Sequence, residues 1–153
     1  MRVTFTEDEL AFRDDVRAFF RDELPEDIVE KQRLGVPLER EDHIRFQKAL
    51  FRKGWAGFNW PVEYGGTGWT TVQKYIFGVE MAQANAPAII PFGLGMVGPV
   101  IYTFGTEAQK QYYLPKLAKG KMLGCLALTE PDAGSDATAL KTVAEPTGDG
   151  NYV

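Results

Sequence analysis

The segment from Leu126 to Ser135 has the residue types and spacing needed to bind a polar ring. A short apolar run leads into Thr129, a turn fixed by Pro131 follows, and Gly134 and Ser135 close the segment. Such a turn directs successive backbone N–H groups and two hydroxyl groups toward one place. That arrangement suits the polar edge of a heterocycle with an adjoining phosphate, and a plain turn between two domains is the alternative interpretation.

Two glycine-rich segments match nucleotide-binding loops only in part. Gly93–Gly98 fits G-x-G-x-x-G, which requires a preceding strand, a clean helix after it and an acidic residue about 20 positions later. Pro91 and Pro99 flank the segment, and no Asp or Glu occurs from residue 108 to residue 129. Tyr64–Gly68 lacks the Lys-Ser/Thr ending of a P-loop. We therefore predict a turn at Tyr64–Gly68. At Gly93–Gly98 we predict that the glycines allow close helix packing or leave space for a ligand.

The single cysteine and the single histidine exclude several kinds of site. Cys125 has no partner for an intrachain disulfide, which indicates a reducing environment. Cys125 and His43 are also too few for a Cys/His zinc site, so we predict no metal site. His43 lies among charged residues and is predicted to occupy a solvated helix face.

Composition and charge indicate a folded domain without nucleic acid or membrane as its main partner. The 153 residues are 44% hydrophobic and 25% charged, and the net charge of −4 comes with no basic block. No charge occurs between Glu80 and Glu107, but prolines and glycines break this stretch and predict a buried core helix instead of a membrane span. The first nine residues contain no apolar segment, so we predict no signal peptide and a cytoplasmic location.

Capping boxes and apolar periodicity predict a helical chain as far as residue 120. Thr6 with Glu9, Thr70 with Gln73, and Thr106 with Gln109 each have the spacing of a capping box. We predict a long connection at Pro25–Pro37 and a packed aromatic loop at Trp55–Trp69. The predicted helices cover about residues 6–24, 38–53, 70–86, 91–104 and 106–120, the last bent or restarted at Pro115.

The pattern changes at Lys121. Leu123–Leu128 is predicted to be a buried strand, Ala139–Glu145 a second strand, and Gly148–Asn151 a hairpin turn. Only two residues follow this turn, which is too few for its return strand. We therefore predict a helical domain at residues 1–120 and the beginning of an incomplete β-domain at residues 121–153.

Three segments, in this order along the chain, resemble the FAD-dependent acyl-CoA dehydrogenases. They are Trp60–Gly66, Phe104–Leu117 and Leu126–Asp136, and together they extend the resemblance over nearly the whole chain. The resemblance implies a mainly α fold, an N-terminal all-α helical domain followed by the first strands of a truncated β-domain. The segment Asn59-Trp60-Pro61 resembles the corresponding segment in the branch of the family that acts on dicarboxylic, steroid-derived or otherwise unusual acyl-CoAs.

The resemblance also implies roles for individual residues. The family's catalytic glutamate, and the Trp-Ile-Thr strand that covers the flavin, are expected beyond Val153, so no catalytic residue is assigned here. Ser135 would lie beside both the flavin pyrophosphate and the acyl-CoA, and Met96, Val97 and Val100 would border the acyl chain. The implied FAD-binding residues are Leu126, Leu128, Thr129, Gly134 and Ser135.

The implied reaction is α,β-desaturation of an acyl-CoA thioester, with hydride transfer to FAD and reoxidation by electron-transfer flavoprotein. The resemblance implies a homo- or hetero-oligomer for the full-length protein and an inactive N-terminal piece. Glu130 would belong to the turn and would not replace the missing base. The alternatives are a non-catalytic helical scaffold or partner subunit, an acyl-CoA oxidase, and a flavin monooxygenase of the same architecture.

Overall fold

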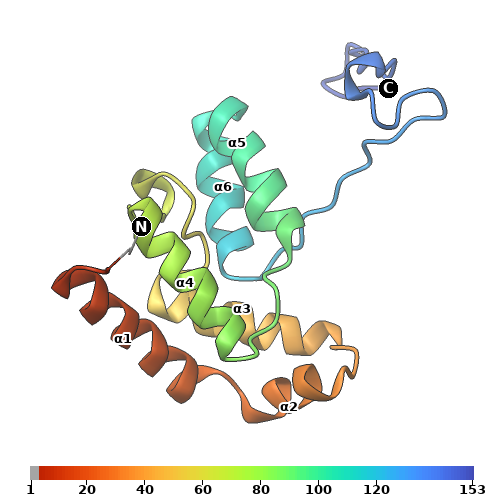
Figure 1. The fold of residues 1–153 in the computed structure, drawn as a ribbon. Coiled ribbons are helices and arrows are strands. Elements are labelled where there is room, and N and C mark those ends of the chain that lie inside the picture. The colour runs from red at the N-terminus through yellow and green to blue at the C-terminus, as the bar shows by residue number, and fades with distance from the viewer. Residues whose placement is uncertain (1–3) are drawn as a thin grey trace.

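The computed structural model describes residues 4–153 as a helical body followed by a C-terminal segment that extends away from it (Figure 1). Residues 1–3, which begin the segment predicted to lack a signal peptide, lie outside the described residues. Three short helical turns are η1 (Val62–Tyr64), η2 (Phe92–Val97) and η3 (Ala137–Ala139). The α-helices of the described chain are α1 (Glu7–Glu23), α2 (Glu26–Leu34), α3 (Arg40–Lys53), α4 (Thr71–Gln83), α5 (Gly98–Phe104) and α6 (Glu107–Ala118).

The three predicted capping boxes are confirmed at the starts of α1, α4 and α6. In each box the threonine hydroxyl accepts a hydrogen bond from the backbone N–H three residues later, and the Glu or Gln at that position accepts one from the threonine N–H. These reciprocal bonds satisfy backbone donors that the first helical turn leaves free. The start of each of these helices is therefore determined by local chemistry.

The prediction of a long connection at Pro25–Pro37 is wrong, because this segment contains α2. Pro25 precedes the first turn, and Gly35 ends the helix in the left-handed conformation at φ 67°. Both are recognised helix boundary signals. Ile28 is fully buried in the main core, and this tertiary contact stabilises a helix of only nine residues.

An aromatic cluster forms the centre of the larger core, between α1, α3, α4 and the loop that follows α3. Phe77 of α4 is 1% exposed, and its ring centroid lies 5.0 Å from that of Phe58 and 5.2 Å from that of Trp69. Trp55 is also buried, with its ring 4.8 Å from Phe19 of α1. The prediction that Trp55–Trp69 is a packed loop is confirmed.

A smaller core joins the loop before η1 to η2, α5 and α6. Its buried members are Trp60, Leu94, Leu114 and Leu117, with Val97 and Ile101 packed against them. The predicted helix at residues 91–104 is thus present, with a π-helical first part, η2, that continues directly into α5. Helix α6 runs through Pro115 without interruption.

The two predicted strands of the C-terminal segment are absent from the described residues. Leu123–Leu128 has no regular secondary structure, and Leu123, Leu126 and Leu128 are each about half exposed. At Ala139–Glu145 the chain leaves η3 and continues without a strand. A strand is stabilised by hydrogen bonds to a neighbouring strand. In the described residues Leu123–Leu128 has no such neighbour, and Ala139–Glu145 is paired only at its last residue, so both apolar runs stay largely exposed.

The turn predictions in the same segment are confirmed. Glu130 and Ala133 exchange backbone hydrogen bonds of 3.2 and 3.1 Å across the proline turn. At the hairpin, Glu145 and Val153 exchange backbone hydrogen bonds of 2.9 and 3.0 Å around the predicted turn. Turns depend on a few adjacent residues, which explains why they form here without a sheet.

Asp42 makes the stability of the α2–α3 junction depend on pH. Its carboxylate accepts hydrogen bonds from Lys31 Nζ (2.7 Å), the Glu39 N–H (3.0 Å) and Arg45 Nη2 (2.9 Å). The hydrogen bond from Lys31, and then that from the Glu39 backbone, lower the pKa of Asp42 from 3.8 to about 2. The pKa of Asp42 is lower in the folded protein than in the unfolded chain. The stability that Asp42 contributes is therefore fully present at pH values above 3.8, and it is lost as the pH falls to about 2.

We therefore expect the urea midpoint of the wild type to exceed that of Asp42→Asn near neutral pH, and the difference to shrink as the pH falls from about 4 to about 2. Urea titrations of both proteins between pH 7 and pH 2 measure this difference, and the carboxylates common to both cancel. A difference that stays constant down to pH 2 contradicts this assignment.

Candidate functional site

An apolar groove lies where α5, α6 and the start of the C-terminal segment meet. Its volume is about 540 Å³. Gln109 provides the main polar side chain in a lining that is otherwise aliphatic, aromatic, glycine or cysteine. The lining residues are Val97, Val100, Ile101, Phe104, Gly105, Gln109, Tyr113, Leu117, Met122, Leu123, Gly124 and Cys125.

Two of the three residues predicted to border the acyl chain line this groove. Val97 ends η2 and Val100 follows in the first turn of α5, and both contribute to the wall. Val100 is 55% exposed, so its side chain is available to a bound molecule. Met96 is outside the lining and is 41% exposed. The structure places Val97 and Val100 in one groove lining, to which Met96 does not belong.

The smaller core supports the floor of the groove. Leu117 of α6 belongs to that core and also lines the groove, and Val97 and Ile101 pack against the same core. Gly124 allows the C-terminal segment to approach η2, because a Cβ at Gly124 would lie 2.7 Å from the Gly93 Cα. The predicted close packing of the glycine-rich helix is confirmed at Gly98, where a Cβ would lie 2.5 Å from Trp60 Cζ2.

The groove also contains residues that the sequence analysis did not assign to it. Ile101 and Phe104 follow Val97 at intervals of four and seven residues, which is the spacing of one helix face. That spacing was a usable signal for both. Tyr113, Met122 and Leu123 come from other elements, and no local pattern connects them to α5.

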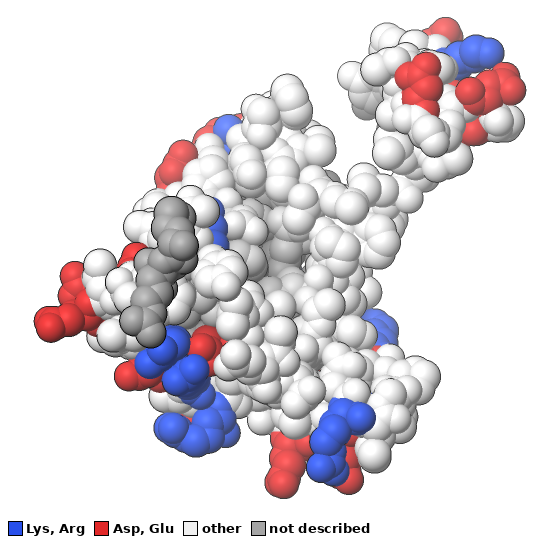
Figure 2. All heavy atoms as spheres, in the orientation of Figure 1, with Lys and Arg blue, Asp and Glu red and all other residues white. Residues whose placement is uncertain are grey.

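The residues predicted to bind FAD begin where the groove ends. Cys125 is the last lining residue, and Leu126, Leu128 and Thr129 follow it along the extended chain, all exposed. Figure 2 shows an uncharged neck between the helical body and the end of the chain. Gly134 and Ser135 are exposed as well. These five residues do not by themselves enclose a flavin, so we derive no catalytic step through this cofactor.

Glu130 is held in its turn. Its carboxylate accepts hydrogen bonds from the backbone N–H groups of Lys141 (2.8 Å) and Thr142 (2.9 Å). Hydrogen bonding from Thr142, and then from the Lys141 backbone, lowers the pKa of Glu130 below its usual range. A general base that acts near neutral pH needs the opposite shift. The geometry agrees with the prediction that Glu130 belongs to the turn.

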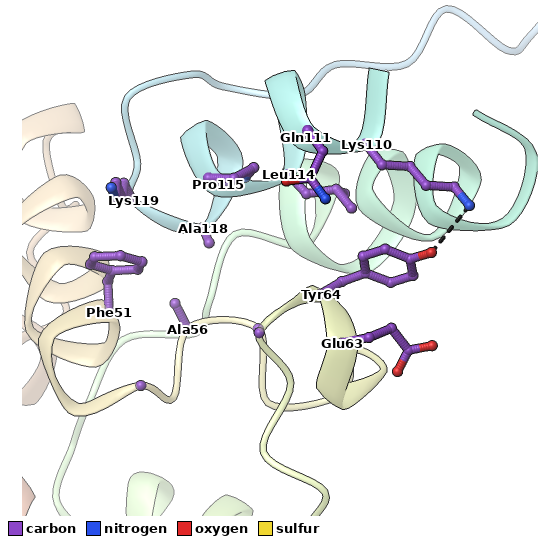
Figure 3. A pocket seen from close by; sticks show the side chains of 13 residues that line it. Phe51, Ala56, Glu63, Tyr64, Lys110, Gln111, Leu114, Pro115, Ala118 and Lys119 are labelled. Atoms are coloured by element: carbon purple, nitrogen blue, oxygen red, sulfur yellow. Dashed lines mark hydrogen bonds between the residues drawn. The ribbon is translucent and has the colours of Figure 1, made fainter. Parts of the chain in front are cut away.

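A second cavity lies on another face of α6, between that helix, the end of α3 and η1 (Figure 3). Its volume is about 270 Å³. Lys110 Nζ donates to the Tyr64 hydroxyl at 3.1 Å at one end, and Phe51 and Lys119 lie at the other. None of the residues predicted to bind substrate or cofactor lines this cavity.

Residues 4–153 contain no group of three or more His, Cys, Asp or Glu side chains placed to hold a metal ion. His43 is half-buried on α3, and Cys125 is exposed. Within the same range, no helix is both long and apolar enough to cross a membrane.

Comparison with known proteins relates this fold to one family. The family model of the acyl-CoA dehydrogenase N-terminal domain matches residues 6–121. Acyl-CoA dehydrogenase IpdE1 of Mycolicibacterium smegmatis is 35% identical over 143 residues, which are 90% of this chain and 36% of that protein. The chain thus spans about a third of the length of this relative.

Solved structures show the same relation. The ChsE4-ChsE5 complex from Mycobacterium tuberculosis matches all of this chain and 38% of its own chain, with a TM-score of 0.75 and 31% identity. The structure called Tcur3481-Tcur3483 steroid ACAD matches 97% of this chain and 38% of its own, with a TM-score of 0.72 and 35% identity. The helical fold, the order of the motifs and the family match agree, and the chain belongs to the acyl-CoA dehydrogenase family through its N-terminal helical domain.

Proposed function

We propose that this chain forms the helical wall of the acyl-binding site in a full-length FAD-dependent acyl-CoA dehydrogenase. The observation that carries this proposal is the apolar groove, which Val97 and Val100 line and which leads through Cys125 into the segment predicted to contact the flavin. A volume of about 540 Å³ lies within the range of small-molecule sites. Burial of an acyl chain there removes apolar surface from water on both sides of the contact.

The proposed reaction is α,β-desaturation of an acyl-CoA thioester. When bound in the full-length protein, FAD supplies the hydride acceptor. The base that takes the α-proton is the glutamate expected beyond Val153. In this scheme the described residues bind and orient the acyl group and exclude water from it. Contacts with the substrate are proposed for Met96 and Ser135. Contacts with FAD are proposed for Leu126, Leu128, Thr129, Gly134 and Ser135.

For the acyl group we propose a bulky substrate of the steroid-derived or dicarboxylic kind. The groove has a volume of about 540 Å³ and is open to solvent at Val100 and Phe104, which are 55% and 81% exposed. The relation to a structure called a steroid ACAD supports the steroid-derived case. A bulky ring system needs a wider groove than a straight chain does.

Partners and domain boundaries are part of the same proposal. Two of the related structures are named for pairs of proteins, which supports a hetero-oligomer for the full-length protein. We propose electron-transfer flavoprotein as its oxidant, residues 1–120 as the helical domain and residues 121–153 as the beginning of the β-domain. The cytoplasmic location stays a prediction from the sequence.

The proposal is tested by comparing the chain alone with the full-length protein. With FAD, a dye acceptor and a panel of acyl-CoAs, we expect dye reduction by the full-length protein and none by residues 1–153, because the base and most of the flavin site are missing from the shorter chain. We also expect residues 1–153 to retain little FAD after gel filtration.

Each outcome of this comparison decides between the candidate functions. Dye reduction by residues 1–153 would contradict the assignment of the base to a later segment. A full-length protein that is inactive toward every acyl-CoA, with and without a partner subunit, would favour the scaffold interpretation. Oxygen consumption with acyl-CoA as the only electron donor would identify an oxidase.

A further inference from the structure

Trp60 connects the aromatic loop to the helix that forms the groove wall. Its side chain is 4% exposed and belongs to the smaller core. The indole Nε1–H donates a hydrogen bond of 2.6 Å to the backbone carbonyl of Leu94, which lies in the middle of η2. Trp60 is 34 residues away from Leu94 in sequence, so this contact fixes η2 from outside its own helix.

The Leu94 carbonyl needs a donor from outside because η2 is a π-helix. In an α-helix this carbonyl would accept from the Gly98 N–H, but that N–H donates to the Gly93 carbonyl. In a π-helix it would accept from the residue five positions later. That residue is Pro99, which has no N–H. Both helical partners are thus excluded, and a buried carbonyl without a partner would destabilise the fold.

The space for the indole is created by Gly98. A Cβ at Gly98 would lie 2.5 Å from Trp60 Cζ2 and 2.9 Å from Trp60 Cε2, so any larger residue would push the ring away. Gly98 is also the first residue of α5 and lies between Val97 and Pro99. The indole therefore contacts the helix at the point where the groove wall begins.

We propose that Trp60 is a positioning residue that sets the width of the acyl groove. The inference rests on the proposed function and deepens it. Trp60 does not line the groove, but Val97, one residue before Gly98, and Val100, two residues after it, both do. By holding the π-helical turn at Leu94 and Gly98, the indole fixes where these two valines stand, and so which acyl groups fit between α5 and α6.

The test uses Trp60→Phe in the full-length protein, with Trp55→Phe as the matched control. Both replacements remove an indole from a buried core position, but Trp55 lies in the larger core, away from η2. We expect the ratio of kcat/KM for a bulky acyl-CoA to that for a straight-chain acyl-CoA to change by roughly 10-fold in Trp60→Phe, mainly through KM. In Trp55→Phe we expect this ratio to change less than about 2-fold.

A second measurement is independent of catalysis. In the same proteins, amide hydrogen exchange of Gly98 reports how firmly the π-helical turn is held. We expect exchange roughly 5- to 10-fold faster in Trp60→Phe than in the wild type, the effect of losing about one hydrogen bond, and no such change in Trp55→Phe. If Trp60→Phe does not fold, Gly98→Ala displaces the indole while keeping its donor; the acyl preference is measured as before, and amide exchange is followed at position 98 of this variant.

The outcomes separate this inference from the proposed function. If the wild type is active, and Trp60→Phe has the same acyl preference as the control variant, the inference is overturned and the proposed function is not. Unchanged exchange at Gly98 also overturns it. A wild type that is inactive toward all acyl-CoAs overturns the proposed function and with it the role in acyl preference.

Discussion

Replacing Val100 with tryptophan in the full-length protein is expected to lower kcat/KM for acyl-CoA by roughly 100-fold or more. Val100 stands on the groove wall at the start of α5, opposite the lining residues of α6. An indole at this position fills space that the acyl group needs. A change of one methylene in a pocket already alters discrimination by about 10- to 200-fold, and this replacement adds much more volume.

The effect is measured by steady-state kinetics with a dye acceptor over acyl-CoAs of increasing size. Because the groove is blocked and the base is untouched, we expect the loss to grow with the size of the acyl group. Val36→Trp is the matched control, since Val36 is also exposed, at 45%, but lies between α2 and α3, outside the groove. Equal losses in the two variants, or none in Val100→Trp, would remove this groove as the acyl site.

Phe77→Ala is expected to lower the free energy of unfolding of the chain by about 3–5 kcal/mol. Phe77 is 1% exposed, and its ring packs against Phe20, Trp55, Phe58 and Trp69 at centroid distances of 5.0–5.8 Å. Removing the ring loses the free energy that is gained by burying it. It also leaves a cavity among rigid aromatic neighbours, which cannot easily collapse into it. This is a large share of the stability of a domain of ordinary size.

Urea unfolding followed by tryptophan fluorescence measures this loss, because Trp55 and Trp69 report directly on the cluster. The control is Tyr75→Ala on the same helix, whose side chain is 63% exposed, and there we expect a change within about 0.5 kcal/mol. A loss below about 1 kcal/mol for Phe77→Ala would contradict the central place of this ring in the core.

Features that depend on neighbouring residues could be predicted from the sequence. The capping boxes at Thr6, Thr70 and Thr106 are complete within four residues each, so their spacing predicted the starts of α1, α4 and α6. Pro131 and the glycines of the hairpin predicted their turns for the same reason. The family, too, was indicated by contiguous motifs, and the match over residues 6–121 confirms it.

Features that depend on a distant partner could not be predicted from the sequence, because they form only when separate elements pack together. Helix α2 is short and needs the burial of Ile28, and the apolar run after Leu123 lacks the neighbouring strand that would make it a strand. The groove brings Val97 together with Tyr113 and Met122 only because α5 packs on α6 and the chain turns back past Gly124. The hydrogen bond from Trp60 to Leu94 joins residues 34 positions apart. Local propensity carries no information about such contacts, since their free energy is gained only when separate elements pack together.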